Sequence, residues 1–239
     1  MKMRKRRWLF LLPVLALLLA AGLYVNDYYH ADAGALAAME SDMAVTVEQA
    51  GGTVVFRPEE PWAGLVFYPG GKVEHTAYAP LLRQLAEAGV LCVLPEMPLR
   101  LAVLDMDAAE GVLEQFPEME DWYLGGHSLG GAMAAAYAAE QAGDYEGLIL
   151  LAAYATKDLS ASELRVLSLY GSEDGVLDLE KYETYRSNLP ADMMEQIIDG
   201  GSHACFGSYG PQDGDGVAAI TQEQQIRITV EAVLELMEN

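Results

Sequence analysis

Short apolar runs alternate with longer segments of helical periodicity along most of this chain. Runs typical of buried strands occur at residues 63–68, 90–94, 121–124, 147–152 and 165–170, with a weaker one at 193–198. Helical spacing is expected between and after them, at residues 76–88, 101–115, 129–142, 178–188 and 217–237. This alternation predicts an α/β protein with a mostly parallel central sheet and helices on both faces. In such a sheet, ligands bind at the carboxyl ends of the strands.

The body of the protein is expected to begin with an antiparallel hairpin. Residues 44–49 and 53–57 read as strands, and they flank the turn sequence Ala50-Gly51-Gly52. The chain has 239 residues and no internal repeat, which suits one sizeable domain. We therefore expect a single domain over residues 44–239, preceded by a linker or short helix over residues 31–43.

The first thirty residues predict a membrane anchor. A basic cluster precedes an uncharged apolar run over residues 8–25, and a helix of this length extends about 27 Å, close to the ~30 Å hydrocarbon core of a bilayer. Basic residues before the run place the N-terminus in the cytoplasm. Residues 1–30 are thus expected to form a cytoplasmic tip and one transmembrane helix, with the rest outside the cytoplasm. The small residues 20–22 leave open an alternative, cleavage by signal peptidase followed by secretion.

The charge of the chain excludes one class of partner. Acidic residues number 36 against 14 basic ones, for a net charge of −22, and five of the basic residues lie within the first seven. The remaining body would repel a phosphate backbone, so we expect no nucleic-acid partner. Two cysteines are too few for a disulfide framework or a Cys-rich zinc site. The Asp-rich stretch at residues 213–216 lacks the spacing of a calcium loop, and no metal or cofactor is expected.

The motif Gly126-x-Ser128-x-Gly130 lies where a predicted strand turns into a predicted helix. In this context the serine sits on a tight turn that exposes its hydroxyl, and small residues on either side let strand and helix approach each other. The N-terminus of the helix also directs free amides and a positive dipole end toward Ser128. Ser128 is therefore the candidate nucleophile.

A serine nucleophile needs a general base and an acid that orients the base. The chain order for this kind of elbow is serine, acid, histidine, and His203 is the only histidine that follows late enough. His127, beside the nucleophile on the turn, is expected to be structural. Asp174 at the end of a predicted strand is the candidate acid, with the adjacent Glu173 as the alternative.

Two backbone amides are expected to form an oxyanion hole. One belongs to Leu129, directly after the nucleophile, and the other to the loop after the first central strand. That loop reads YPGGKV over residues 68–73, and Gly71 is its candidate donor.

Four segments carry a resemblance to a known family. They contain FYPGGKVEHTAYAPLLRQLAEAGV, GGHSLGGAMAAAYA, LYGSEDGV and GGSHACFGSYGPQDGDG, at residues 67–90, 125–138, 169–176 and 200–216. The chain resembles an α/β-hydrolase, of the small bacterial group without a lid. The resemblance implies the α/β-hydrolase fold and a triad of Ser128, Asp174 and His203. One departure is Pro69, which stands where many esterases have the histidine of an HG oxyanion motif.

These residues predict a serine hydrolase that acts on a carboxylic ester or related acyl substrate through an acyl-enzyme. The expected partner is thus a small acyl compound. An acyltransferase or a peptidase would use the same triad. A non-catalytic envelope protein that binds ligands on this scaffold is the alternative from another class, although it would have no need for all three residues.

Overall fold

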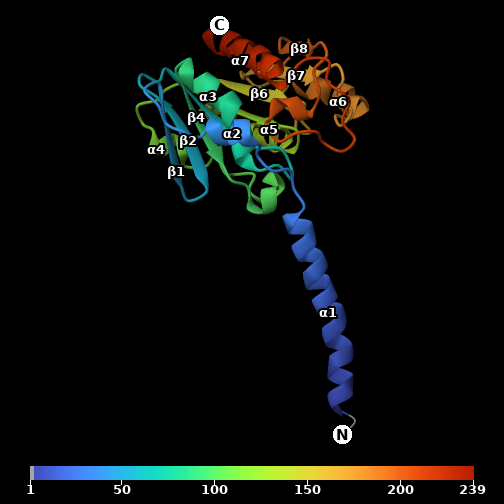
Figure 1. The fold of residues 1–239 in the computed structure, drawn as a ribbon. Helices are drawn as coiled ribbons and strands as arrows, with labels where there is room; N and C mark the ends of the chain where they lie inside the picture. Colours follow the sequence, from blue (N-terminus) through green and yellow to red (C-terminus); the bar gives the residue numbers. More distant parts are fainter. Residues whose placement is uncertain (1–2) are drawn as a thin grey trace.

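The computed structural model describes residues 3–239, without the side chains of residues 3–11, 20 and 21. Eight strands form one sheet in the order β1-β2-β4-β3-β5-β6-β7-β8 (Figure 1). Their bounds are β1 Val45–Ala50, β2 Thr53–Pro58, β3 Ala63–Tyr68, β4 Val90–Pro95, β5 Trp122–His127, β6 Gly147–Leu151, β7 Arg165–Gly171 and β8 Met194–Ile198. The α-helices are α1 Met3–Asn26, α2 Ala33–Ala37, α3 Ala79–Glu87, α4 Val112–Gln115, α5 Leu129–Gln141, α6 Leu179–Tyr185 and α7 Gln222–Glu238.

The sheet is mostly parallel, as the alternation predicted. β1 pairs antiparallel with β2, and β2 with β4, whereas every other neighbouring pair is parallel. The turn between β1 and β2 places Gly51 and Gly52 at φ 59° and 87°. This left-handed backbone favours glycine, which explains the hairpin signal.

Two hydrophobic layers cover the two faces of the sheet. Side chains alternate along a strand, so Leu65 and Phe67 of β3 pack in one layer while Val66 and Tyr68 pack in the other. Helices α3 and α7 contribute to the first layer and α5 to the second. Because β3 is buried on both faces, it reads as a continuous apolar run rather than an alternating one.

The prediction of one helix over residues 101–115 is wrong. Residues 102–104 form a short 3-10 helix, and α4 covers only the last turn. The Tyr68 hydroxyl donates to the Met106 carbonyl (2.8 Å) and accepts from the Ala109 amide (2.9 Å). These tertiary hydrogen bonds engage backbone groups that a helix would use, and Gly111 at φ 71° ends the irregular stretch.

The N-terminal helix α1 extends away from the globular body (Figure 1). Among the helices of the described residues, none is both long enough and apolar enough to cross a membrane. The expected transmembrane helix is therefore not found there. Its predicted span, residues 8–25, includes positions 8–11, 20 and 21, whose side chains lie outside the described part.

Residues 31–43, expected as a linker or short helix, contain α2 and pack on the body. Ala35 of α2 is fully buried, and the Asp32 side chain caps the helix by accepting from the Ala35 amide at 2.9 Å. The Asp32 amide in turn donates to the Ser208 carbonyl at 2.9 Å. This segment is thus fastened to a loop near the carboxyl edge of the sheet.

Candidate active site

Ser128 occupies the turn between β5 and α5. Its φ of 53° and ψ of −122° lie in a region that residues other than glycine rarely adopt. The turn also needs its two glycines: a Cβ on Gly130 would lie 2.3 Å from the Tyr68 carbonyl oxygen, and one on Gly126 would lie 2.7 Å from the Gly130 carbonyl carbon. Residues 126–130 therefore form the tight strand-to-helix turn that the motif predicted.

The loop after β3 lies directly against the start of α5. A Cβ on Gly71 would lie 2.9 Å from Cδ2 of Leu129, so the two expected oxyanion donors are neighbours. Leu129 is the first residue of α5, where amides have no intrahelical partner. Within residues 3–239, the Gly71 amide donates no backbone hydrogen bond. Both amides are thus available, and their role in an oxyanion hole stays a prediction.

A buried tyrosine, Tyr78, holds this loop to the elbow. Its hydroxyl accepts from the Gly70 amide at 3.0 Å and lies 2.8 Å from Nδ1 of His127. Burial raises the pKa of Tyr78, so the hydroxyl stays protonated and can donate a hydrogen bond to Nδ1 of His127. Burial, and then the nearby His203, hold the pKa of His127 well below its usual range. His127 is therefore neutral, in agreement with its expected structural role.

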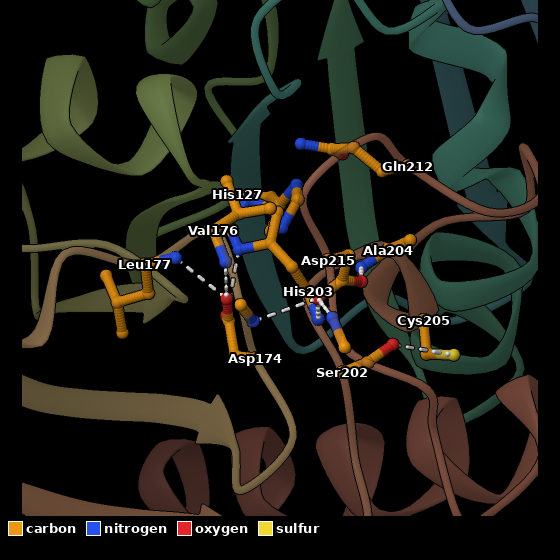
Figure 2. Close-up of polar contacts among 12 residues, drawn as sticks. His127, Asp174, Val176, Leu177, Ser202, His203, Ala204, Cys205, Gln212 and Asp215 are labelled. Atoms are coloured by element: carbon orange, nitrogen blue, oxygen red, sulfur yellow. Dashed lines mark hydrogen bonds and ion pairs between the residues drawn. The ribbon is translucent and has the colours of Figure 1, made fainter.

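The structure pairs His203 with Asp174. His203 Nδ1 lies 2.8 Å from Asp174 Oδ2, and the two side chains are only 2% and 1% exposed. Oδ1 of Asp174 accepts from the amides of Val176 (2.9 Å) and Leu177 (2.8 Å), as Figure 2 shows. With both carboxylate oxygens engaged as acceptors, Asp174 accepts a hydrogen bond from the Nδ1–H group of His203, which leaves Nε2 unprotonated and able to act as a base. The alternative acid, Glu173, is exposed and contacts Ser172 instead.

Ser128 and His203 belong to separate loops. The ring of His127, the residue before Ser128, lies against the ring of His203. The ring centroids of His127 and His203 are 4.5 Å apart, which places the candidate base against the residue that precedes the candidate nucleophile. Within the described residues, no hydrogen bond joins the Ser128 hydroxyl to His203. Such catalytic hydrogen bonds often form only when substrate is bound.

Asp215 is a site residue that sequence reasoning missed. Its carboxylate accepts from the amides of His203 (3.1 Å), Ala204 (2.8 Å), Gly175 (3.1 Å) and Gly216 (2.8 Å), several of them visible in Figure 2. Partial burial raises its pKa, but the backbone hydrogen bonds outweigh this effect and lower the pKa overall. The ionised carboxylate thus joins the loop that carries Asp174 to the loop that carries His203. In the sequence, residues 213–216 resembled only a calcium loop, and their spacing excluded that interpretation. Nothing in the pattern indicated a role for Asp215 in the site.

Within residues 3–239, no group of three or more His, Cys, Asp or Glu side chains is placed to hold a metal ion.

Comparison with known proteins decides the family. The family model described as "Alpha/beta hydrolase family" matches residues 64–227, which include the elbow, Asp174 and His203. The chain belongs to the alpha/beta hydrolase family. No curated protein matches the sequence significantly.

Solved structures share the alpha/beta hydrolase fold with this chain. A predicted CIB-like hydrolase from Thermoplasma acidophilum has a TM-score of 0.58 at 17% identity, over 81% of this chain and 100% of that one. An alpha/beta hydrolase enzyme from the metagenome of lagoon sediments of Mar Chica, Morocco, has a TM-score of 0.60 at 16% identity, over 80% and 98%. Est1E from Butyrivibrio proteoclasticus has a TM-score of 0.58 at 14% identity, over 82% and 100%. At sequence identities this low, the structural similarity shows a common fold and nothing about a shared activity.

Proposed function

We propose that this alpha/beta hydrolase is a serine hydrolase that cleaves carboxylic esters through an acyl-enzyme. The Ser128 hydroxyl attacks the substrate carbonyl carbon while His203 takes its proton, and the amides of Gly71 and Leu129 stabilise the resulting oxyanion. The bond to the alcohol then breaks as His203 returns the proton to that oxygen. Water then attacks the acyl-enzyme in the same way: His203 takes a proton from the water and returns it to the Ser128 oxygen, and the carboxylic acid is released.

One observation carries the proposal: the buried hydrogen bond between Asp174 and His203, beside the strained turn of Ser128. A scaffold that only bound ligands would gain nothing from a positive φ at a serine, which costs about 1–3 kcal/mol. Ester hydrolysis is the default reaction because esters are the least demanding acyl substrates for such a triad. An acyltransferase would differ only in the acceptor that replaces water.

The architecture also favours an open site. The connection from β6 to β7 covers residues 152–164 and contains no helix, so no helical cap is inserted there. We infer that access to Ser128 depends on the loops around it rather than on a lid.

The first test is hydrolysis of p-nitrophenyl acetate, butyrate and octanoate by the full chain in detergent. We expect turnover, and labelling of the protein by a fluorophosphonate probe. The dependence of kcat/KM on acyl length would measure the size of the acyl pocket. No turnover of any ester together with no labelling of the folded protein would contradict the proposal and favour a binding scaffold.

We further propose that residues 1–30 anchor the protein in a membrane, with the hydrolase domain outside the cytoplasm. The basic cluster followed by the apolar run over residues 8–25 supports this, as does the exposure of the leucines at positions 12, 15, 17, 18, 19 and 23 on α1. We expect the full chain to sediment with membranes after carbonate extraction, and a chain that lacks residues 1–26 to stay in the supernatant. Recovery of a shortened chain from the medium would instead indicate the cleaved, secreted form.

A further inference from the structure

The residues that follow α1 are fastened to two loops of the candidate active site. Tyr29 forms a parallel bridge with Val73: its amide donates to the Lys72 carbonyl (2.8 Å), and its carbonyl accepts from the Glu74 amide (2.9 Å). The Tyr29 hydroxyl accepts from the Asp213 amide at 3.0 Å. The chain leaving α1 thus contacts both the loop that carries Gly71 and the loop that follows His203. The catalytic edge of the sheet therefore lies at the foot of α1.

Two cations strengthen this junction by packing on aromatic rings. Lys72 Nζ lies 4.0 Å from the ring centroid of Tyr24 and donates to the Tyr24 carbonyl. The guanidinium carbon of Arg100 lies 3.4 Å from the ring centroid of Tyr28. Tyrosines with neighbouring lysine and arginine side chains are typical of the interface between a bilayer and water. The junction therefore has the composition expected at the level of lipid headgroups.

The segment after β4 exposes four large apolar side chains close to this junction. They are Leu99 (51% exposed), Val103 (50%), Leu104 (53%) and Met106 (44%). Figure 1 shows the green segment after β4 on the side of the body from which α1 leaves. Four large apolar side chains exposed within eight residues concentrate apolar surface in one short segment, and concentrated apolar surface marks a membrane or protein contact. We call residues 99–106 the apolar rim.

The apolar rim is hydrogen-bonded to the loop of the expected oxyanion hole. The Lys72 amide donates to the Arg100 carbonyl at 2.8 Å, and the Tyr68 hydroxyl donates to the Met106 carbonyl at 2.8 Å. Leu99 and Arg100 both have positive φ, at 51° and 60°. This backbone costs energy for residues other than glycine, so the surrounding contacts must maintain it. The conformation of the rim is therefore fixed by its contacts with the loop that carries Gly71.

We propose that the apolar rim lies in the lipid surface to which α1 attaches, and that the substrate is a lipid ester taken from that surface. This inference rests on the proposed ester hydrolysis and the proposed anchor. A bilayer would cover the exposed leucines of α1 and the apolar rim together, because both lie on the same side of the body. The rim adjoins the loop of Gly71, so an acyl chain passing along it reaches the edge of the sheet where Ser128 lies. The strongly acidic body makes general attraction to anionic lipids weak, so the contact is mainly apolar.

The test compares the double variant Val103→Ser/Leu104→Ser with the unaltered full chain, both reconstituted in vesicles. The substrates are a fluorogenic diacylglycerol ester in the same vesicles and water-soluble p-nitrophenyl acetate. Losing two exposed apolar side chains from a lipid contact should lower activity on the vesicle ester by about tenfold or more, with acetate hydrolysis changed by less than about twofold. The matched control is Leu179→Ser/Ile197→Ser, which removes side chains of similar exposure (48% and 54%) from α6 and β8. Unchanged activity on the vesicle ester, or an equal loss on both substrates, would overturn the proposal.

A second measurement does not depend on activity. Tryptophan introduced as Leu104→Trp should be quenched by lipids with brominated acyl chains, beyond the quenching of the parent protein, whereas Ile197→Trp should not. Absence of quenching at position 104 in protein that floats with vesicles would overturn the membrane contact. Quenching without hydrolysis of either ester would instead contradict the proposed ester hydrolysis and leave the contact standing. A smaller particle in detergent for the rim double variant would assign the rim to a contact between two copies, which also overturns the proposal.

Discussion

Replacing Ser128 with alanine is expected to lower kcat for p-nitrophenyl ester hydrolysis by roughly 10⁶-fold, to near the background rate, because no other hydroxyl occupies the elbow. The fold should survive, since the hydrogen bond from the Ser128 amide to the Leu151 carbonyl (2.9 Å) involves only backbone atoms. Initial rates measured beside the melting temperature of each protein check both statements. Fluorophosphonate labelling should disappear with the hydroxyl.

The matched control for this prediction is Ser187→Ala. Ser187 is exposed and belongs to the short 3-10 helix Arg186–Asn188, outside the elbow, so its removal should leave both turnover and labelling unchanged. Persistent labelling of a folded Ser128→Ala protein would show that another residue is the nucleophile. The assignment of the elbow as the reaction centre would then be wrong.

Replacing Asp174 with asparagine is expected to lower kcat by about 10⁴-fold with little change in KM. The amides of Val176 and Leu177 donate to Oδ1, so they would hold the carboxamide oxygen of the asparagine at that position. Its NH₂ group would then face Nδ1 of His203 in place of Oδ2. Histidine would have to accept at Nδ1 and carry its proton on Nε2, where it could no longer take the proton of Ser128.

The neighbouring carboxylate provides the control for Asp174. Glu173→Gln removes an equal charge from the same loop, but Glu173 is exposed and its carboxylate contacts Ser172. We expect less than about a twofold change in kcat, as for most surface substitutions. Loss of activity in Glu173→Gln with full activity in Asp174→Asn would reverse the assignment of the acid.

Much of the fold could be predicted because the signals are local. A strand buried on both faces needs an unbroken apolar run, as in β3 and β6, and the turn between β1 and β2 needs glycine at positive φ. The elbow is equally local: Gly126 and Gly130 are four residues apart, and a Cβ on Gly126 would lie 2.7 Å from the Gly130 carbonyl carbon. The pairing of Asp174 with His203 was also predicted, through the chain order that the elbow implies.

Other features could not be predicted because their partners are distant along the chain. Helical spacing over residues 101–115 suggested a helix, and only the hydroxyl of Tyr68, packed below that segment, shows why the helix is broken. Tyr78 reads as part of an amphipathic helical segment, yet it connects Gly70 to His127. Nothing in the local pattern marks these tyrosines as different from other core residues.

The sequence by itself determined the alternating architecture, the serine elbow and the order of the candidate triad, because backbone sterics and hydrophobic periodicity act between near neighbours. Only the tertiary structure decided how the loops of the site are held. Asp215 joins the loops of Asp174 and His203, and Tyr29 joins the foot of α1 to the loop of Gly71. These are hydrogen bonds to backbone amides and carbonyls, which every residue except proline possesses. Which backbone groups come within hydrogen-bond distance depends on how the chain packs. These contacts therefore could not be predicted from residue types or their spacing.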